Sequence, residues 1–309
     1  MKMTLYALLP LAAMMAGCGE TPPGTEAARP VTLEKPAAEK LVRKIEKERA
    51  ETREWLRSSP RSYLAAIDRI SFGDRLSLTV GSAAGNDVRL AASGIEPHHL
   101  KITAEGDQFR VQAVDERARF KLEKEDKREA VIDPSFIQVG RFSLRLSHQR
   151  FPAIIVFDPQ SPRFREFKGL EYFPVDLSFR YELTLKRDPK PVAILSTRGN
   201  QRRAERAGWL DFYVGETLCR LEATRLLEPG SGENDLSVFF RDATSGKESY
   251  PLGRYVDLEK LENGRYLLDF NLAYNPACAF SDYYNCPIPP KSNTLSVAIR
   301  AGEMDSHYH

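Results

Sequence analysis

The chain has 309 residues, of which 28% are charged and 42% hydrophobic, a balance typical of a folded globular body. Its 45 basic and 43 acidic residues give a formal net charge of +2. Because nucleic-acid-binding domains concentrate basic residues on one surface, this near balance argues against a nucleic-acid partner.

A basic residue and a short apolar run open the sequence. The apolar run, residues 5–17, is too short to span a bilayer as a mature helix. Its position and small-residue end are those of a secretory signal. We therefore expect residues 1–17 to be a signal peptide.

The residues around Cys18 resemble the bacterial lipobox. Ala16 and Gly17 stand directly before Cys18, which implies cleavage before the cysteine and acylation of its thiol and its new amine. Several acyl chains give a stable membrane anchor. The alternative is an ordinary signal peptide with an incidental cysteine. Since Gly19 rather than aspartate follows, the expected location is the outer membrane of the bacterial envelope, facing the periplasm.

Two further segments precede the predicted strands. Residues 18–36 are rich in Pro, Gly, Thr, Glu and Ala and are predicted to be a flexible tether. Residues 37–70 form a predicted helical segment. Its first helix is charged with a thin apolar stripe, and we expect its Trp55 end to dock on the body rather than enter a coiled coil. A short second helix is expected over residues 61–70.

Apolar alternation with period two begins after residue 71 and predicts strands. Gly-containing turns separate these short strands, so residues 71–157 are predicted to be a small β-sandwich. The alternating residues are Leu76, Leu78, Val80, Val88, Leu90, Leu100, Ile102, Phe109, Val111, Ile137, Val139, Phe142, Leu144 and Leu146.

Part of this sandwich, residues 80–102, resembles the core of a forkhead-associated domain. Asn86 matches the structural asparagine of that family and His99 its packing histidine. Ser82 stands where the family has its phosphate-gripping arginine, and Glu96 stands where it has a phosphate-contacting serine. Because a hydroxyl and a carboxylate replace a cation and a hydroxyl, the resemblance implies the fold without phosphothreonine recognition.

The remaining body, residues 158–303, again alternates in the manner of strands, and a tail follows at residues 304–309. The predicted fold class is mainly β: two β-sandwich or partly open barrel domains, preceded by the helical segment. No cofactor-binding motif is present, and the adjacent His98 and His99 point to opposite faces of a strand, so no cofactor and no metal are expected.

The end of this second domain carries a block that resembles the signature of the domain-of-unknown-function family numbered 1684. The block runs over residues 269–278 and 286–290 and ends at Ala301-Gly302-Glu303. Upstream segments share the resemblance, and they comprise residues 163–170, 173–176, 240–246 and 253–255. The resemblance implies an architecture, and it supplies no activity.

The cysteines other than Cys18 are Cys219, Cys278 and Cys286. In an oxidising envelope, the short spacing between Cys278 and Cys286 predicts a disulfide that clasps the loop. A redox switch of that loop is a further possibility. Cys219 alternates with leucines and is predicted to be a buried hydrophobe.

Polar residues cluster in the second domain and are candidates for a ligand site, because Tyr and Asn supply amphipathic contact area and adaptable hydrogen bonds. If the strand with Phe239 lies beside the strand with Asp269, Asp242 and Arg254 would line one cleft. Each residue also has a structural interpretation, as a turn cap or a strand-pairing ion pair. The ligand-binding candidates are Arg241, Asp242, Thr244, Tyr250, Arg254, Tyr255, Asn271, Tyr274, Asn275 and Asn293.

Catalytic motifs are scarce. The second domain has no histidine between His148 and His307, which disfavours Ser-His or Cys-His chemistry. Any catalysis would fall to the carboxylates Asp242, Asp269 and Glu303. The leading hypothesis is a non-enzymatic, lipid-anchored envelope protein that binds a polar small ligand or an envelope protein. The alternative is a carboxylate-dependent hydrolase of an envelope glycan or peptide polymer.

Overall fold

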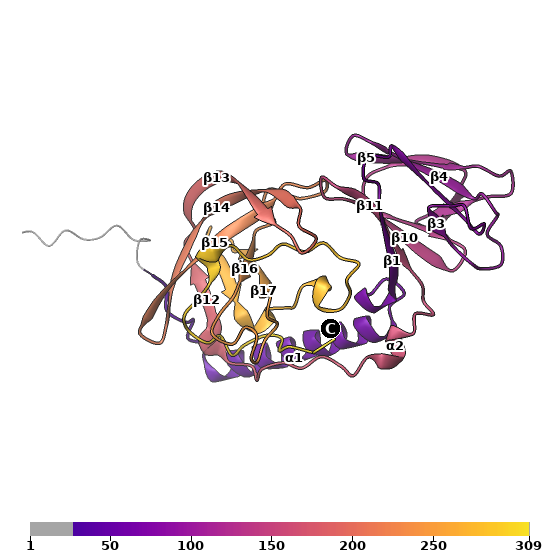
Figure 1. Cartoon of the computed structure of the whole chain (residues 1–309). Coiled ribbons are helices and arrows are strands. Elements are labelled where there is room, and N and C mark those ends of the chain that lie inside the picture. Colours follow the sequence, from indigo (N-terminus) through magenta and orange to yellow (C-terminus); the bar gives the residue numbers. More distant parts are fainter. Residues whose placement is uncertain (1–26, 309) are drawn as a thin grey trace, which may run out of the picture.

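The computed structural model describes residues 27–308. Two β-rich lobes are joined by one long helix, which runs along the C-terminal lobe and ends at the N-terminal lobe (Figure 1). The predicted mainly β class is confirmed, and each sheet in residues 27–308 is open, so none closes into a barrel. The predicted signal peptide, Cys18 and residues 18–26 of the predicted tether lie outside the described residues.

Residues 27–34 of the predicted tether lie against the C-terminal lobe. Ala28 forms a parallel bridge with Phe212 and donates its N–H to Asp211 at 2.9 Å. Val31 donates to the carbonyl of Arg180 at 2.8 Å. Because these backbone groups are paired, this part of the chain is not the free linker that its composition predicted.

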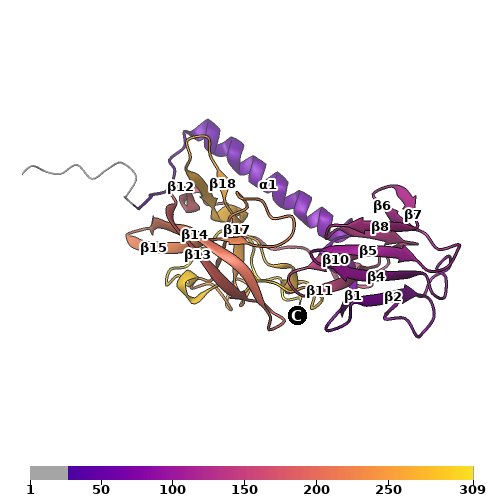
Figure 2. The ribbon, with the colours of Figure 1, turned by 90° about the horizontal axis from the view of Figure 1, so that it is seen from above.

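The predicted helix is confirmed as α1 (Lys35–Ser58). Ala, Lys, Glu and Arg favour helix, and Pro36 stands in its first turn, where a missing N–H costs nothing. Ile45, Arg49 and Leu56 form its buried face. Trp55 meets Tyr63 edge-on at 5.0 Å between ring centroids, so this end of the helix docks as expected. Figure 2 shows α1 crossing from one lobe to the other.

The prediction of a second helix over residues 61–70 is wrong. A 3₁₀ turn at Tyr63–Ala65 leads directly into strand β1 (Ala66–Ser71). This strand pairs antiparallel with β11 (Pro152–Phe157) and has a bulge after Ala66. Hydrogen bonds to a strand far along the chain outweigh the weak local helical pattern. This distant pairing cannot be read from the local sequence.

The N-terminal sandwich packs two sheets. One has the order β1-β11-β10-β9-β6-β7, and the other β3-β2-β4-β5-β8. Of the alternating residues predicted for this sandwich, Leu76 lies before β2 and is 78% exposed, whereas all the others are buried. The remaining strands are β2 (Ser77–Gly81), β3 (Val88–Arg89), β4 (Leu100–Glu105), β5 (Gln108–Ala113), β6 (Phe120–Leu122), β7 (Glu125–Lys127), β8 (Glu129–Ile132), β9 (Phe136–Val139) and β10 (Phe142–His148).

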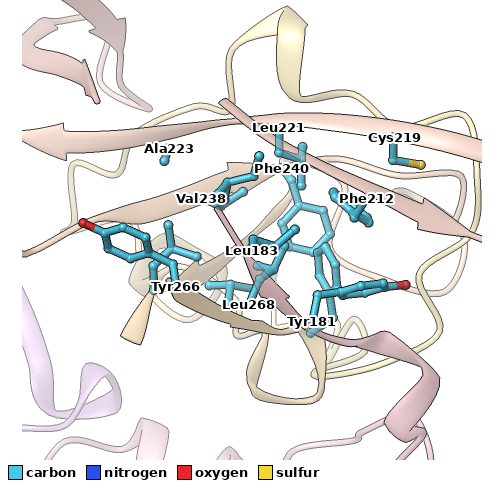
Figure 3. Packing of buried hydrophobic residues seen from close by; sticks show 14 of the residues in the cluster. Tyr181, Leu183, Phe212, Cys219, Leu221, Ala223, Val238, Phe240, Tyr266 and Leu268 are labelled. Carbon is cyan, nitrogen blue, oxygen red and sulfur yellow. The ribbon is translucent and has the colours of Figure 1, made fainter. Parts of the chain in front are cut away.

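The C-terminal lobe combines a five-stranded antiparallel sheet, β13-β14-β15-β16-β17, with a three-stranded sheet, β12-β19-β18. Their facing sides enclose the aromatic and aliphatic core of Figure 3, which includes Cys219 as predicted. The strands are β12 (Arg180–Leu183), β13 (Lys186–Leu195), β14 (Gln201–Val214), β15 (Thr217–Leu226), β16 (Ser237–Phe240), β17 (Arg254–Asp257), β18 (Glu259–Lys260) and β19 (Tyr266–Asp269).

The strand neighbours expected around the candidate site differ in the structure. β16 pairs with β15 and β17, whereas β19 pairs with β12 and β18 in the other sheet. The Phe240 and Phe270 rings meet across the core at 5.1 Å. The two segments therefore face each other through apolar packing, and no cleft opens between them along a shared sheet.

Much of the C-terminal segment is irregular. It contains 3₁₀ turns at Phe270–Leu272, Ala277–Ala279 and Lys291–Asn293, and a similar turn at Leu177–Phe179 follows the short helix α2 (Arg163–Glu166). The segment also builds the joint between the lobes. The joint is an apolar cluster that includes Leu56, Ile155, Phe157, Phe280 and Tyr284.

Candidate functional site

A cleft of about 390 Å³ lies between α1 and the segment Asn271–Asn275, and we call it the helix cleft. It opens where the long helix passes over the irregular C-terminal segment. Its lining residues are Glu48, Arg49, Thr52, Trp55, Leu56, Tyr63, Tyr172, Asp257, Asn271, Leu272, Ala273, Tyr274, Asn275, Phe280 and Glu303.

On the helix side, Arg49 is 4% exposed, and its Nε is buried without a hydrogen-bond partner. Its guanidinium donates to the carbonyls of Phe173 at 2.9 Å and Asn271 at 3.1 Å. The same group lies 4.7 Å from the centre of the Tyr172 ring. Burial lowers the pKa of Arg49. This cation attaches α1 to the C-terminal lobe.

Glu303 forms part of the cleft floor and is 4% exposed. Its Oε2 accepts the Asn275 N–H at 2.8 Å, and its Oε1 accepts the Tyr172 hydroxyl at 3.4 Å. Burial raises the pKa of Glu303 to about 7. Beside it, Asn275 donates to the Met304 carbonyl at 2.8 Å, while its own Oδ1 is buried without a hydrogen-bond partner.

Asp257 and Tyr274 form the rim opposite the helix. The Tyr274 hydroxyl donates to the two Asp257 carboxylate oxygens at 3.2 and 3.4 Å, and Ser237 donates to Asp257 at 2.6 Å. Burial raises the pKa of Tyr274, so its proton stays on the ring oxygen. No Lys, Arg or His side chain in residues 27–308 lies within 4.0 Å of the Asp257 carboxylate, and this residue is exposed.

Of the predicted site residues, the structure brings Asn271, Tyr274, Asn275 and Glu303 together in this cleft. The others lie elsewhere, mostly in buried contacts with the protein itself.

Asp242 and Arg254 form the largest of these contacts. Arg254, 1% exposed, donates to Asp242 at 2.9 Å and to the carbonyls of Ile299, Ala301 and Glu303. The other Asp242 oxygen accepts from the hydroxyl and the N–H of Thr244 at 2.6 and 3.0 Å. All three polar side chains thus fasten the C-terminal segment and line no cleft, in contrast to the shared cleft expected for Asp242 and Arg254.

Asp269 and Asn293 have similar roles. Asp269 is paired with Arg180 at 2.6 Å and accepts from the Asn271 backbone and side chain. Asn293 donates to the carbonyls of Glu222 and Phe239 and accepts the Glu222 N–H at 2.7 Å. Because Asp242 and Asp269 are each paired with a different arginine, the three candidate carboxylates do not form one catalytic set.

Three candidates remain. Arg241 contributes its backbone, which bridges to Thr294. Tyr255 donates its hydroxyl to the carbonyl of Pro287. The Tyr250 hydroxyl lies 3.8 Å from the sulfur of Cys278 in the joint.

The prediction of a disulfide between Cys278 and Cys286 is wrong. Cys219, Cys278 and Cys286 are all buried free thiols. Cys286 Sγ accepts the Cys278 N–H at 3.3 Å, and hydrogen bonding to Cys278, together with burial, raises the pKa of the Cys286 thiol. The loop keeps its shape through apolar packing and through backbone hydrogen bonds such as Thr197 N–H to Cys286 O at 2.9 Å, so it needs no covalent clasp.

Sequence reasoning missed the α1 side of the cleft, including Glu48, Arg49 and Trp55. A signal was present, since Arg49 lies four residues after Ile45 and seven before Leu56, in the middle of the apolar stripe. A cation at such a position is buried only if it has partners, which indicates a polar contact beneath the helix.

The loops of the N-terminal sandwich agree with the resemblance noted in the sequence. Asn86 donates to the carbonyls of Ala83 and Pro97 at 2.9 and 2.7 Å. His99 accepts the Glu96 N–H at 3.1 Å, and its other ring nitrogen lies 2.8 Å from the Arg119 carbonyl. These side chains pin the loops, and His99 is a structural histidine.

Two absences concern residues 27–308 alone. No helix in this range is long and apolar enough to cross a bilayer. The same range contains no group of three or more His, Cys, Asp or Glu side chains arranged to hold a metal ion.

Residues 165–304 match the model of a family described as protein of unknown function, DUF1684. An uncharacterized protein of Haloarcula marismortui, solved by NMR, is 38% identical; the match covers 49% of this chain and 85% of that protein, with a TM-score of 0.39. Two FHA domains also match. The FhaA FHA domain, solved with the intracellular domain of Rv3910, is 16% identical (26% and 78% covered, TM-score 0.20). An FHA domain solved for its phosphothreonine-dependent interactions is 18% identical (26% and 75% covered, TM-score 0.21). No curated protein matches the chain.

Proposed function

Since this chain belongs to DUF1684, a family of proteins of unknown function, we propose its function from its own geometry: it is a non-enzymatic binding protein whose helix cleft takes a small polar ligand. The observation that carries the proposal is the convergence of α1 and the segment Asn271–Asn275 on one polar, aromatic cleft of about 390 Å³. That volume is within the range of small-molecule sites.

The cleft offers a ligand both hydrogen-bond acceptors and a donor. Glu48, Asp257 and Glu303 contribute carboxyl groups to its lining. Tyr274 and two of the three Arg49 nitrogens donate to protein acceptors, whereas the Arg49 Nε is buried without a partner. A ligand that satisfies this lining must donate to the carboxyl groups and accept from Arg49, so we infer a compound with several hydroxyl groups, which do both, and with room for an ammonium group.

Aromatic side chains supply the apolar part of the site. Trp55 is 39% exposed at the rim, and Tyr63 lies against it. Rings beside carboxylates suit a ligand with one apolar face and a polar edge, such as a sugar ring, and they also favour a cationic group. A monosaccharide or an amino sugar has the size and the donors that the cleft requires.

The proposal includes a place in the cell. Cys18, preceded by Ala16 and Gly17, would be acylated and would anchor the protein to the outer membrane, facing the periplasm. Metabolic labelling with an alkyne fatty acid tests this, with labelling expected for the native protein and lost in Cys18→Ala. Labelling of that variant at the native level would exclude the anchor.

The geometry supports binding better than hydrolysis. Asp242 and Asp269 are held in separate ion pairs, at 2.9 Å from Arg254 and 2.6 Å from Arg180. Glu303 is enclosed by its own hydrogen bonds. A glycosidase needs two carboxyl groups facing one bond of the substrate, and these three do not supply such a pair.

Isothermal titration calorimetry of the full chain with glucosamine and with glucose tests the binding proposal. Binding of both sugars would assign recognition to hydroxyl donors, and binding of glucosamine alone would assign it to the ammonium group. Asp257→Asn should weaken binding about tenfold or more, since a hydrogen bond to a charged group contributes about 1.5 to 3 kcal/mol. The exposed Glu262, outside the cleft, provides the matched control Glu262→Gln. No heat with either sugar, or equal binding by Asp257→Asn, would refute the proposal.

A further inference from the structure

A second cleft, of about 190 Å³, lies in the joint between the two lobes, and we call it the arginine cleft. One wall is the outer face of the six-stranded sheet, and the other is the segment from Pro276 to Pro287. Its lining residues are Tyr63, Arg69, Arg145, Ser147, Gln149, Ile155, Arg202, Tyr255, Tyr274, Pro276, Ala277, Tyr284, Asn285, Cys286 and Pro287. Three are arginines, and none is Asp or Glu.

Strand register brings two of these arginines to the same face. Ile155 of β11 stands opposite Arg69 of β1 on one side and opposite Arg145 of β10 on the other. Residues directly opposite in antiparallel strands project to the same side of the sheet. Ile154 and Val156 project to the sandwich core, so Arg69 and Arg145 project away from it, into the cleft.

The third arginine, Arg202 of β14, comes from the C-terminal lobe. Its Nε donates to Glu228 at 2.6 Å and its Nη1 to the Asn285 carbonyl at 3.0 Å. Glu228 therefore neutralises this guanidinium. Arg202 closes the cleft from the side opposite Arg69 and Arg145.

The other two arginines lack such compensation. Within residues 27–308, neither Arg69 nor Arg145 has a carboxylate within 4.0 Å. The Arg69 side chain makes a single hydrogen bond, from Nη1 to the Tyr283 carbonyl at 3.3 Å, and its Nε is buried without a partner. Burial and the neighbouring charges of Arg198, Arg145 and Arg202 lower the pKa of Arg69 to about 10.

Such an arrangement opposes folding, because like charges repel and an unpaired buried donor loses its hydration. Groups arranged at the expense of stability are typical of binding sites. Arg69 and Arg145 each present a guanidinium group to the same cleft, and Ser147 and Tyr284 also line it. Such groups suit a planar or tetrahedral oxyanion, which guanidinium groups bind through paired hydrogen bonds.

We infer that the arginine cleft binds a small oxyanion, a phosphate or carboxylate group, between Arg69 and Arg145 of the N-terminal sandwich and Arg202 of the C-terminal lobe. The bound anion bridges the two lobes and compensates the charges that the protein leaves unpaired. The cleft is on the outer face of the sheet, away from the loop residues Ser82 and Glu96, where the phosphate site of forkhead-associated domains is lost.

Thermal unfolding of the full chain, with inorganic phosphate or succinate at constant ionic strength, tests this site. Each anion that binds raises Tm in a concentration-dependent way, because it binds the folded state alone. A response to phosphate only assigns the site to phosphate groups, and a response to succinate only assigns it to carboxylates. No response to either anion would overturn the inference.

Variants separate an anion site from a structural arginine. Arg145→Gln should weaken anion binding about tenfold or more, since it removes a charge-assisted fork. Without anion it should be as stable as the native protein or more stable, because it removes repulsion from Arg69. Lys121→Gln, an exposed cation on β6 of the same sheet, is the matched control and should respond as the native protein does. If Arg69→Gln and Arg145→Gln both keep the full anion response, the inference is wrong.

The inference does not rest on the proposed function, since sugars and anions are assigned to different clefts. Failure of the calorimetric sugar titration leaves the anion test unaffected, and failure of the anion test leaves the helix cleft unaffected.

Discussion

Replacing Glu303 by glutamine should change how stability depends on pH. Glu303 is 4% exposed, and burial raises its pKa to about 7, from 4.5 for an unperturbed glutamate. The difference of about 2.5 pKa units corresponds to about 3 kcal/mol, at about 1.36 kcal/mol per unit. Glu303→Gln keeps the size of the side chain and an acceptor for the Asn275 N–H, and it removes the titration.

The sign follows from the direction of the shift. A raised pKa means that the folded protein holds this proton more tightly than the unfolded chain does. The favourable contribution of protonated Glu303 is therefore complete below pH 4.5, declines as the pH rises, and is absent above about pH 7. Relative to Glu303→Gln, the native protein should lose about 3 kcal/mol of unfolding free energy across that window.

Urea denaturation of both proteins between pH 4.5 and 8.5 measures this difference, because all other titrating groups are common to the pair. Glu248→Gln is the control. Glu248 is paired with Arg300, which lowers its pKa below 4.5, so its titration lies almost entirely below this window and Glu248→Gln should differ from the native protein by a nearly constant amount across it. Parallel pH profiles for the native protein and Glu303→Gln would refute the reasoning about Glu303.

Three further variants probe the C-terminal segment and the joint. Arg254→Met should cost about 3 to 5 kcal/mol in urea unfolding, because it leaves Asp242 charged and buried without its partner; a loss below about 1 kcal/mol would contradict this. Gly302 has φ +80°, and a Cβ there would lie 2.5 Å from the Ala273 carbonyl oxygen. Gly302→Ala should therefore lower the free energy of unfolding by at least about 2 kcal/mol and weaken glucosamine binding. Unchanged stability would show that the backbone adapts. Phe280→Ala should cost about 3 to 5 kcal/mol and increase protease cleavage between the lobes, whereas native-like resistance would show that the joint does not depend on this ring.

The sequence predicted those parts of the fold in which local pattern and tertiary contact agree. Leu78, Val80, Leu100 and Ile102 alternate along their strands and are all buried. The segment at residues 61–70 shows the opposite case, because its strand forms through pairing with β11, more than eighty residues away. Such pairing leaves no local periodicity from which it could be predicted.

Polar residues of the C-terminal segment were recognised correctly as unusual, and most have a structural explanation. An irregular segment has no neighbouring strand to hydrogen-bond with its backbone N–H and C=O groups, so side chains must form these hydrogen bonds. Asn293 alone pairs with three backbone groups of β15 and β16. Composition does not distinguish such an asparagine from Asn275, whose Oδ1 has no partner in the protein.

The two clefts could not be predicted from the sequence, because each joins residues from several distant parts of the chain. Nothing in the local sequence distinguishes Arg69 and Arg145 from other strand arginines. Only the register with Ile155 shows that they lie on the same face of the sheet. Arg202 then approaches from another lobe, which no local pattern indicates.

The two clefts share a wall, since Tyr63 and Tyr274 line both. Tyr274 also donates its hydroxyl to Asp257 on the helix-cleft side. Tyr63 packs against the rings of Trp55, Phe280 and Tyr284. Substitution of either tyrosine would perturb both clefts at once and could not assign an effect to one of them. Asp257 and Arg145 each line only one cleft, which is why they separate sugar binding from anion binding.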